Sequence, residues 1–341
     1  MLHRILTSIT HKITELPILV LMPHSSCNCR CVMCDIWKAN QQKHELSIED
    51  LQVHIASFKK LKVKRVALSG GEALMHTNLW SFCELLKSID IKISLLSTGL
   101  TLKKHAQEIV QHIDDVIVSI DGSPSIHNQI RNIPNAFEKL QSGVMEIKRL
   151  DPNFRITGRC VLQKLNHHDL LNIIETSKNL HLDQISFLPA DVSSEAFNRP
   201  NAWSKERVTE VSLATNEIEV LEELVAKSIA KYAKEYQDKF IAESPRKMRD
   251  IVQYYKAILG EGEFPRKKCN APWVSAVIET DGEVKPCFFY PSYGNIRGKD
   301  IFEIVNNSDA IAFRRNLNVK TDNTCVRCVC SLHVGITQSS Y

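Results

Sequence analysis

Three cysteines lie within eight residues of one another near the start of the chain. Cys27, Cys31 and Cys34 have a C-x3-C-x2-C spacing. Cubane iron–sulfur clusters are held by cysteine thiolates, normally one to each iron. Three thiolates in so short a loop could hold one corner of a cubane and leave its fourth iron open to a ligand. A structural zinc site, which takes four ligands, and chance clustering are the alternatives.

The cysteines are also informative through their number. The chain has eleven among 341 residues, and its first apolar stretch, residues 16–22, follows Lys12 and Glu15 without a small-residue cleavage site. No apolar stretch approaches the length of a membrane-spanning helix. We therefore expect a cytoplasmic protein with no membrane partner. Thiols stay reduced in that compartment, so tight cysteine clusters there indicate metal binding or catalysis.

The composition also indicates which classes of partner the protein binds. The chain is 43% hydrophobic and 24% charged, which is typical of a well-cored protein, and its net charge is only +4. The tightest basic cluster is residues 266–268, which we expect to be a solvated loop. A nucleic-acid partner is not expected, because such binding needs Lys and Arg gathered on one face or helix.

The elements that position these residues alternate between strands and helices. Six short runs rich in Val, Ile and Leu are typical of parallel strands covered on both faces. The predicted strands are 18–23, 65–70, 93–98, 116–121, 156–162 and 184–189. One predicted helix begins at residue 47, and four more span 79–89, 102–112, 136–149 and 168–180. The pattern predicts an α/β fold, a partial (β/α)6 barrel. Active sites of such sheets lie at the carboxyl ends of the strands, where the three-cysteine loop falls, and this position favours the iron–sulfur interpretation.

The rest of the chain has a different pattern. Helical periodicity predicts one long helical stretch over 204–240 and a second helix over 245–259. A smaller cysteine-rich unit begins at Cys269 and contains a hairpin, whose turn is Asp281-Gly282, and a helix near 301–315.

Further motifs extend the pattern of the cysteine loop. Ser69-Gly70-Gly71-Glu72 lies at the end of the second predicted strand. Ser119-Ile120-Asp121-Gly122 lies at the end of the fourth, and Arg131 comes after it. Together with the cysteine triplet, residues 16–190 resemble the radical S-adenosylmethionine (SAM) superfamily. The resemblance implies a [4Fe–4S] cluster on Cys27, Cys31 and Cys34 whose open iron is chelated by SAM.

The same resemblance implies roles around the cofactor. Gly70 and Gly71 would let the backbone approach SAM, and Glu72 would accept hydrogen bonds from its ammonium group. Ser119 and Asp121 would face its ribose or carboxylate. Two further residues are expected to bind the cofactor: Arg131 and Trp37, the latter against adenine. A simple turn, a helix cap, a surface residue and plain core packing are the respective alternatives.

The second cysteine set resembles a C-terminal extension of this superfamily. Its five members lie after residue 266: Cys269, Cys287, Cys325, Cys328 and Cys330. They resemble the SPASM domain or its shortened form, Twitch, which implies one auxiliary [4Fe–4S] cluster on Cys269, Cys287, Cys325 and Cys328. Cys330 could replace Cys328 or lie near the substrate, and a structural zinc is the alternative. We thus expect a radical SAM core at 1–200, a helical connector at 201–265 and a SPASM/Twitch-like domain at 266–341.

The resemblance also implies an activity. SAM would be cleaved reductively to a 5′-deoxyadenosyl radical that abstracts hydrogen from a substrate, with electrons from a flavodoxin- or ferredoxin-type donor. We expect a two-electron oxidation of a small polyol or sugar. Only 26 residues precede Cys27, too few for a leader-peptide-binding domain. Peptide or protein side-chain modification and a non-enzymatic electron carrier are the alternatives. Arg159, a charge within an apolar strand, is the predicted catalytic or substrate-side residue.

Overall fold

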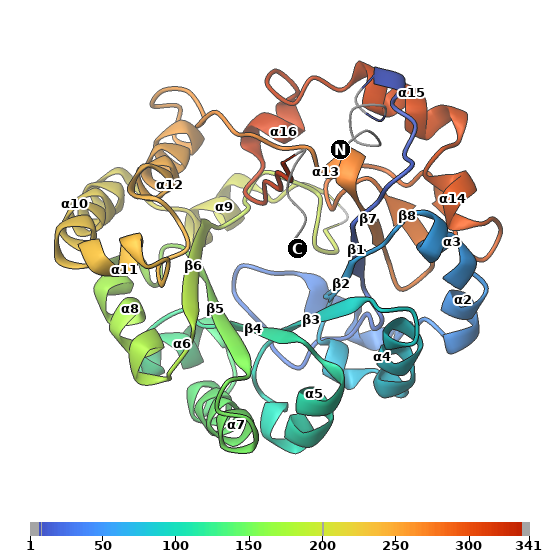
Figure 1. The fold of residues 1–341 in the computed structure, drawn as a ribbon. Helices are drawn as coiled ribbons and strands as arrows, with labels where there is room; N and C mark the ends of the chain where they lie inside the picture. Colours follow the sequence, from blue (N-terminus) through green and yellow to red (C-terminus); the bar gives the residue numbers. More distant parts are fainter. Residues whose placement is uncertain (1–6, 8, 200, 336–341) are drawn as a thin grey trace.

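The computed structural model describes residues 7, 9–199 and 201–335, and its centre is a curved sheet. Figure 1 shows the strands as an arc with helices on its outer side. Six parallel strands follow the chain in order. They are β1 (Ile18–Leu21), β2 (Arg65–Leu68), β3 (Lys92–Ser97), β4 (Asp115–Ser119), β5 (Arg155–Leu162) and β6 (Gln184–Pro189). The predicted partial (β/α)6 barrel is confirmed.

The helices between these strands cover the outside of the arc. They are α2 (Ile48–Gln52), α3 (Ile55–Lys60), α4 (Leu79–Lys87), α5 (Ala106–His112), α6 (Pro124–Arg131), α7 (Ala136–Leu150) and α8 (Leu170–Asn179). Apart from α6, whose end lies against the 30–32 segment, these helices bury apolar side chains in the core that the sheet shares, as Leu51 and Phe58 do. Because the six strands are parallel, their carboxyl ends lie at the same edge of the sheet, where the loops that follow them can meet.

The long helix predicted over 204–240 is wrong. The structure has three helices there, α9 (Lys205–Val211), α10 (Thr215–Lys231) and α11 (Ala233–Gln237), followed by α12 (Pro245–Ile258). Ser212 is extended, with ψ 160°, and the Glu217 carboxylate accepts the Ala214 N–H at 2.7 Å. This contact starts a new helix, because a side chain satisfies a backbone donor that has no partner within the helix.

The C-terminal unit continues the same sheet instead of standing apart. Strand β7 (Ser275–Ile278) pairs in parallel with β1, and β8 (Glu283–Lys285) and β9 (Gly294–Asn295) extend it antiparallel. The Asp281-Gly282 turn falls between β7 and β8, as predicted. Sequence periodicity did not show that the hairpin edge meets the first strand, because that pairing joins segments about 250 residues apart.

Four helices complete the C-terminal unit. They are α13 (Ala271–Val274), α14 (Ile301–Ile304), α15 (Ser308–Asn316) and α16 (Asn323–Arg327). The single helix predicted over 301–315 is therefore also wrong. Asn307 interrupts it, since its side-chain oxygen accepts the Ala310 N–H at 2.8 Å and caps α15.

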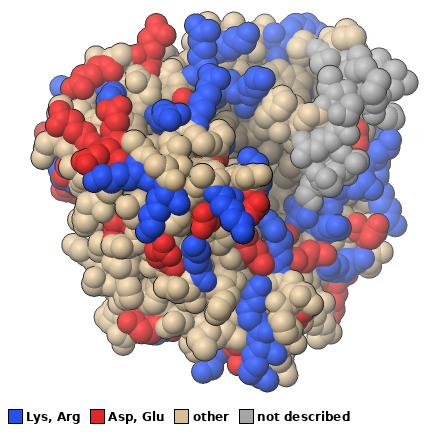
Figure 2. Space-filling model, turned by 60° about the vertical axis from the view of Figure 1, so that its left-hand side comes forward, with Lys and Arg blue, Asp and Glu red and all other residues tan. Residues whose placement is uncertain are grey.

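The surface shows charges of both signs. Figure 2 shows Lys and Arg scattered among Asp, Glu and uncharged residues over one face. Within the described part of the chain, no helix is long and apolar enough to cross a membrane.

Candidate active site

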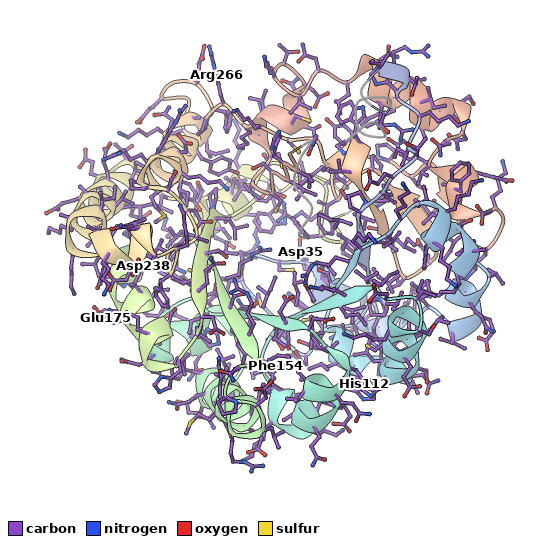
Figure 3. All side chains as sticks on the ribbon, viewed as in Figure 1. Asp35, His112, Phe154, Glu175, Asp238 and Arg266 are labelled. Atoms are coloured by element: carbon purple, nitrogen blue, oxygen red, sulfur yellow. The ribbon has the colours of Figure 1, made fainter. Side chains whose placement is uncertain are left out.

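The three-cysteine loop follows the carboxyl end of β1, and hydrogen bonds to its backbone groups hold it in place. The Asn40 side chain brackets Cys27, accepting its N–H and donating to its carbonyl, both at 2.9 Å. Arg30 and Val32 donate their N–H groups to the last residues of α6, each at 3.1 Å. Asp35, the residue after Cys34, lies at the centre of the molecule in Figure 3, whereas His112, Glu175 and Arg266 lie at its periphery. The loop is thus inside the arc of strands.

The thiols of this loop suit a cubane. Cys27 and Cys34 are half-buried and Cys31 is 7% exposed. Burial raises the pKa of Cys27 to about 12 and that of Cys34 to about 11, and all three thiols influence one another electrostatically. A hydrogen bond from Cys29 lowers the pKa of Cys31 to about 7 against the opposing effect of burial. Three mutually close thiols on one anchored loop fit the donor set of such a cluster.

The cysteine sites differ from a site that binds a single metal ion. Among the described residues, no three His, Cys, Asp or Glu side chains are grouped closely enough to hold one metal ion. A cubane binds each thiolate through a different iron, so its ligands are spread around a larger group.

The Gly-Gly pair after β2 allows the chain to pass close to the cysteine loop. Gly70 has φ +100°, and a Cβ on Gly71 would lie 2.0 Å from the Ser26 carbonyl oxygen. That carbonyl accepts the Glu72 N–H at 2.9 Å. The glycines therefore dock the end of β2 against the residue before Cys27.

Glu72 is fully buried next to the end of β3. Its carboxylate accepts hydrogen bonds from the Thr98 N–H and hydroxyl, both at 2.7 Å, and from Ser97 at 3.2 Å. Burial raises the pKa of Glu72, and these hydrogen bonds oppose the shift. The structure thus holds Glu72 through β3; its contact with SAM remains a prediction.

Asp121 and Arg131 form a buried ion pair that reaches the cysteine loop. Arg131 bonds the Asp121 carboxylate, and its Nη1 donates to Cys31 Sγ at 3.5 Å. Burial raises the pKa of Asp121 while Arg131 opposes that shift. The Asp121 N–H donates to His127 Nδ1 at 3.2 Å, and burial lowers the pKa of His127 to about 3. A contact of Asp121 or Arg131 with SAM remains a prediction.

The remaining predicted cofactor and substrate residues are Ser119, Arg159 and Trp37. Ser119 pairs with Arg159 across β4 and β5, and both side chains are accessible there. In the part of the chain that the structure describes, the Arg159 side chain makes no hydrogen bond or ion pair, although its charge acts on Glu243 and Cys330. Trp37 is half-buried in the short 3-10 helix Ile36–Gln41.

The second cysteine set meets around one small cavity of about 30 Å³, which residues of α13 and α16 also line. All five thiols line it: Cys269, Cys287, Cys325, Cys328 and Cys330. Burial raises the pKa of Cys287 to about 12 and that of Cys330 to about 11. Five thiols around one cavity exceed the four that close a cubane, so this donor set also fits the group.

Polar side chains outside the cysteine pattern hold this second site. Tyr290 bonds both Asp322 and, at 3.2 Å, Cys325 Sγ. Lys267 turns inward and donates to the Cys328 carbonyl, which corrects the expectation of a wholly solvated basic loop. Asn270 holds the tail through two side-chain hydrogen bonds to Val334, each 2.9 Å long.

The sequence did not reveal several of these positioning residues. Asn40 and Tyr290 carry no spacing signal, because their partners lie elsewhere in the chain. Lys267 stands in a basic run that is typical of a surface loop. Only the neighbouring cysteines marked their regions as functional.

Comparison with known proteins gives the same assignment. The radical SAM superfamily model matches residues 21–176, and the SPASM iron–sulfur cluster-binding domain model matches residues 269–329. The chain belongs to the radical SAM superfamily, whose members are enzymes, and carries a SPASM-type domain. This membership implies [4Fe–4S] clusters and SAM as its cofactors.

Individual relatives are more distant. GTP 3′,8-cyclase of Staphylococcus epidermidis is 28% identical over 207 residues, which cover 57% of this chain and 58% of the relative. The probable GTP 3′,8-cyclase of Methanococcus maripaludis strain C7 is 32% identical over 122 residues, 35% of this chain and 41% of the relative. The chain therefore matches less than two thirds of the length of either relative.

Solved structures share the fold across more of the chain. Streptococcus suis SuiB bound to S-adenosylmethionine covers 97% of this chain, with 76% of its own length matched, a TM-score of 0.65 and 13% identity. The protein anSMEcpe with bound AdoMet covers 92% of this chain, with 88% of its own length matched, a TM-score of 0.62 and 18% identity.

Proposed function

We propose that this chain is a radical SAM oxidoreductase of the maturase type, acting on a peptide or protein side chain. The observation that carries the reaction is the anchored three-cysteine loop at the carboxyl ends of the strands, with buried Glu72 and Arg131 beside it. A reduced cluster there would supply the electron that cleaves SAM into methionine and a 5′-deoxyadenosyl radical.

The protein's own groups would prepare this step. Asn40 fixes the backbone of Cys27, and the Arg131 guanidinium offsets negative charge at Cys31. Glu72 offers a buried carboxylate next to the loop, whose charge suits an ammonium group. The surrounding strands exclude water and keep reactive groups oriented.

The proposed net reaction removes two electrons from the substrate. One hydrogen atom of the substrate forms a C–H bond in 5′-deoxyadenosine. The remaining substrate radical loses one electron to the auxiliary site and one proton to solvent. A low-potential one-electron reductant, of the flavodoxin or ferredoxin class, supplies the electron consumed in SAM cleavage.

The size of the substrate cavity favours a peptide. A cavity of about 950 Å³ lies between the segments that flank the cysteine loop, the 195–199 segment and the C-terminal hairpin. This volume is at the upper end for small-molecule sites. Three phenylalanines with ring centroids 5.9–6.5 Å apart line it: Phe197, Phe288 and Phe289. SuiB has been solved with its precursor peptide SuiA, so this fold accommodates a peptide in another protein.

Arg159 would contribute on the substrate side. Its guanidinium is exposed inside the arc of strands and makes no ion pair with another described residue. We propose that it binds a carboxylate of the substrate, since such a charge-assisted pair is favourable where water is excluded.

The first test is the formation of 5′-deoxyadenosine. We expect the anaerobically reconstituted protein to form it from SAM and dithionite, and a Cys27/Cys31/Cys34→Ala triple variant to form none. Mass spectrometry measures the product. Its absence from wild-type protein with both clusters intact would contradict the proposal.

The substrate is tested by isotope transfer. Perdeuterated peptides that together contain all side chains, and perdeuterated polyols, would be offered separately. Deuterium in 5′-deoxyadenosine from a peptide supports the maturase assignment. Deuterium only from a polyol would replace it with the small-molecule oxidation that the sequence favoured.

A further inference from the structure

One segment after β6 contacts the end of the three-cysteine loop through three side chains. The Trp203 indole N–H donates to Asp35 Oδ2 at 2.7 Å, and Asn198 Nδ2 donates to the Asp35 carbonyl at 3.4 Å. Arg207 donates to the Val32 carbonyl. These contacts join residues more than 160 positions apart and surround the backbone on both sides of Cys34.

Trp203 is itself held by two cations. The Arg199 guanidinium lies over its ring at 3.8 Å from the centroid, and that of Arg207 lies at 4.8 Å. Arg199 is 5% exposed and is fixed by an ion pair with Asp191 at 3.1 Å. Cation–π contacts of this kind restrict the orientation of the indole. Its N–H is therefore directed at Asp35 by packing as well as by the hydrogen bond.

Asp35 links this arrangement to a cluster ligand. It directly follows Cys34, is only 3% exposed, and forms an ion pair with Lys38 at 2.9 Å, while the Arg199 charge also acts on it. Lys38 is 54% exposed, so solvent screens its charge. Trp203 is the less mobile donor. A buried carboxylate needs such donors, because without them its charge is poorly stabilised.

We propose that Trp203 is a positioning residue for the three-cysteine site: through its hydrogen bond to Asp35 it fixes Cys34 and tempers the negative field at a cluster bound there. This inference rests on the proposed function. Loss of the hydrogen bond exposes that cluster to more of the Asp35 charge. Since reduction adds a negative charge, the reduction potential then falls.

The test uses the reconstituted full-length protein and the reduced-cluster EPR signal that changes when SAM is added. Trp203→Phe keeps a ring for both guanidinium groups but removes the N–H. We expect its midpoint potential to be more negative than that of wild type. Asp35→Asn should move the potential in the opposite direction, and adding Trp203→Phe to it should cause little further change. Trp80→Phe is the matched control, since Trp80 stacks on peripheral His112.

The outcomes separate the inference from the proposed function. An unchanged or less negative potential in Trp203→Phe overturns the inference, because opening the site to water alone would raise the potential. An undiminished shift in the Asp35→Asn background also overturns it. If Trp203→Phe does not assemble a cluster, an Asp35→Asn potential that is not raised above that of wild type overturns the inference. A wild-type signal that does not respond to SAM would instead contradict the proposed function.

Discussion

The two cysteine regions are held by different means. The three-cysteine loop spans eight residues, follows a buried strand, and is anchored by backbone hydrogen bonds and a buried ion pair. The second region gathers its thiols from Cys269 to Cys330 and is held by side chains such as Tyr290 and Asn270. A compact motif can thus be recognised locally, whereas a dispersed one exists only once the chain has folded.

The largest expected effect distinguishes Cys328 from Cys330. We predict that Cys328→Ala lowers the iron content of reconstituted protein from roughly eight to roughly four atoms per chain, since a cubane holds four. Cys330→Ala, the matched control, should retain both clusters. Iron analysis and EPR measure the difference. The reverse result would assign Cys330 as the fourth ligand.

A second prediction concerns the ion pair beneath the three-cysteine loop. Arg131→Met should destabilise the fold by about 3–5 kcal/mol, because it leaves the Asp121 carboxylate buried without its partner. Urea denaturation of the apoprotein measures the loss. An Asp121→Asn/Arg131→Met double variant should recover much of it, and failure to recover would show that packing, not charge, dominates.

The third prediction concerns the pH dependence of stability, to which His127 next to the three-cysteine region contributes. The folded-state pKa of His127 lies near 3, below its unfolded value of about 6.5. The unfolded chain therefore binds more protons as the pH falls below about 6.5, and stability is lost in that direction. His127→Gln should remove up to about 1.4 kcal/mol of this loss per pH unit.

Urea midpoints at pH 7 and pH 5.5 measure this difference. His168→Gln, an exposed substitution in α8's leading turn, is the control. Equal pH dependence in wild type and His127→Gln would rule out His127 as a source of acid sensitivity.

The smallest effect is expected at the tail of the second region. Asn270→Ala removes the two side-chain hydrogen bonds to Val334 and should cost about 1–2 kcal/mol of local stability. We expect faster chelator-driven iron loss from the auxiliary site, with the exposed Asn201→Ala as control. Equal rates would show that the tail does not support that site.

Much of the core could be predicted from the sequence. Apolar runs predicted all six strands to within a few residues, and a helix predicted to begin at residue 47 is α2, which Ser47 and Asp50 cap. The breaks in the helices predicted over 204–240 and 301–315 were missed. They depend on local caps by Glu217 and Asn307 that periodicity does not register.

The candidate site shows the same division. The sequence indicated the thiols and the Gly-Gly-Glu motif, but not that Asp121 pairs with Arg131 or that Trp203 reaches Asp35. The residues of each cysteine or glycine motif lie close together in the sequence. The Asp121–Arg131 and Trp203–Asp35 contacts join residues from different elements, and no sequence spacing predicts them.

By itself, the sequence determined the family, the parallel core and the cysteine chemistry, because these depend on local periodicity and on residue types that few other functions require. The tertiary structure alone decided that β7 joins β1, that Cys330 lines the same cavity as the other four thiols of its region, and that the segment after β6 holds the loop around Cys34. The physical reason is that burial, ion pairing and hydrogen bonding act between neighbours in space. Such neighbours are set by how the whole sheet curves and closes.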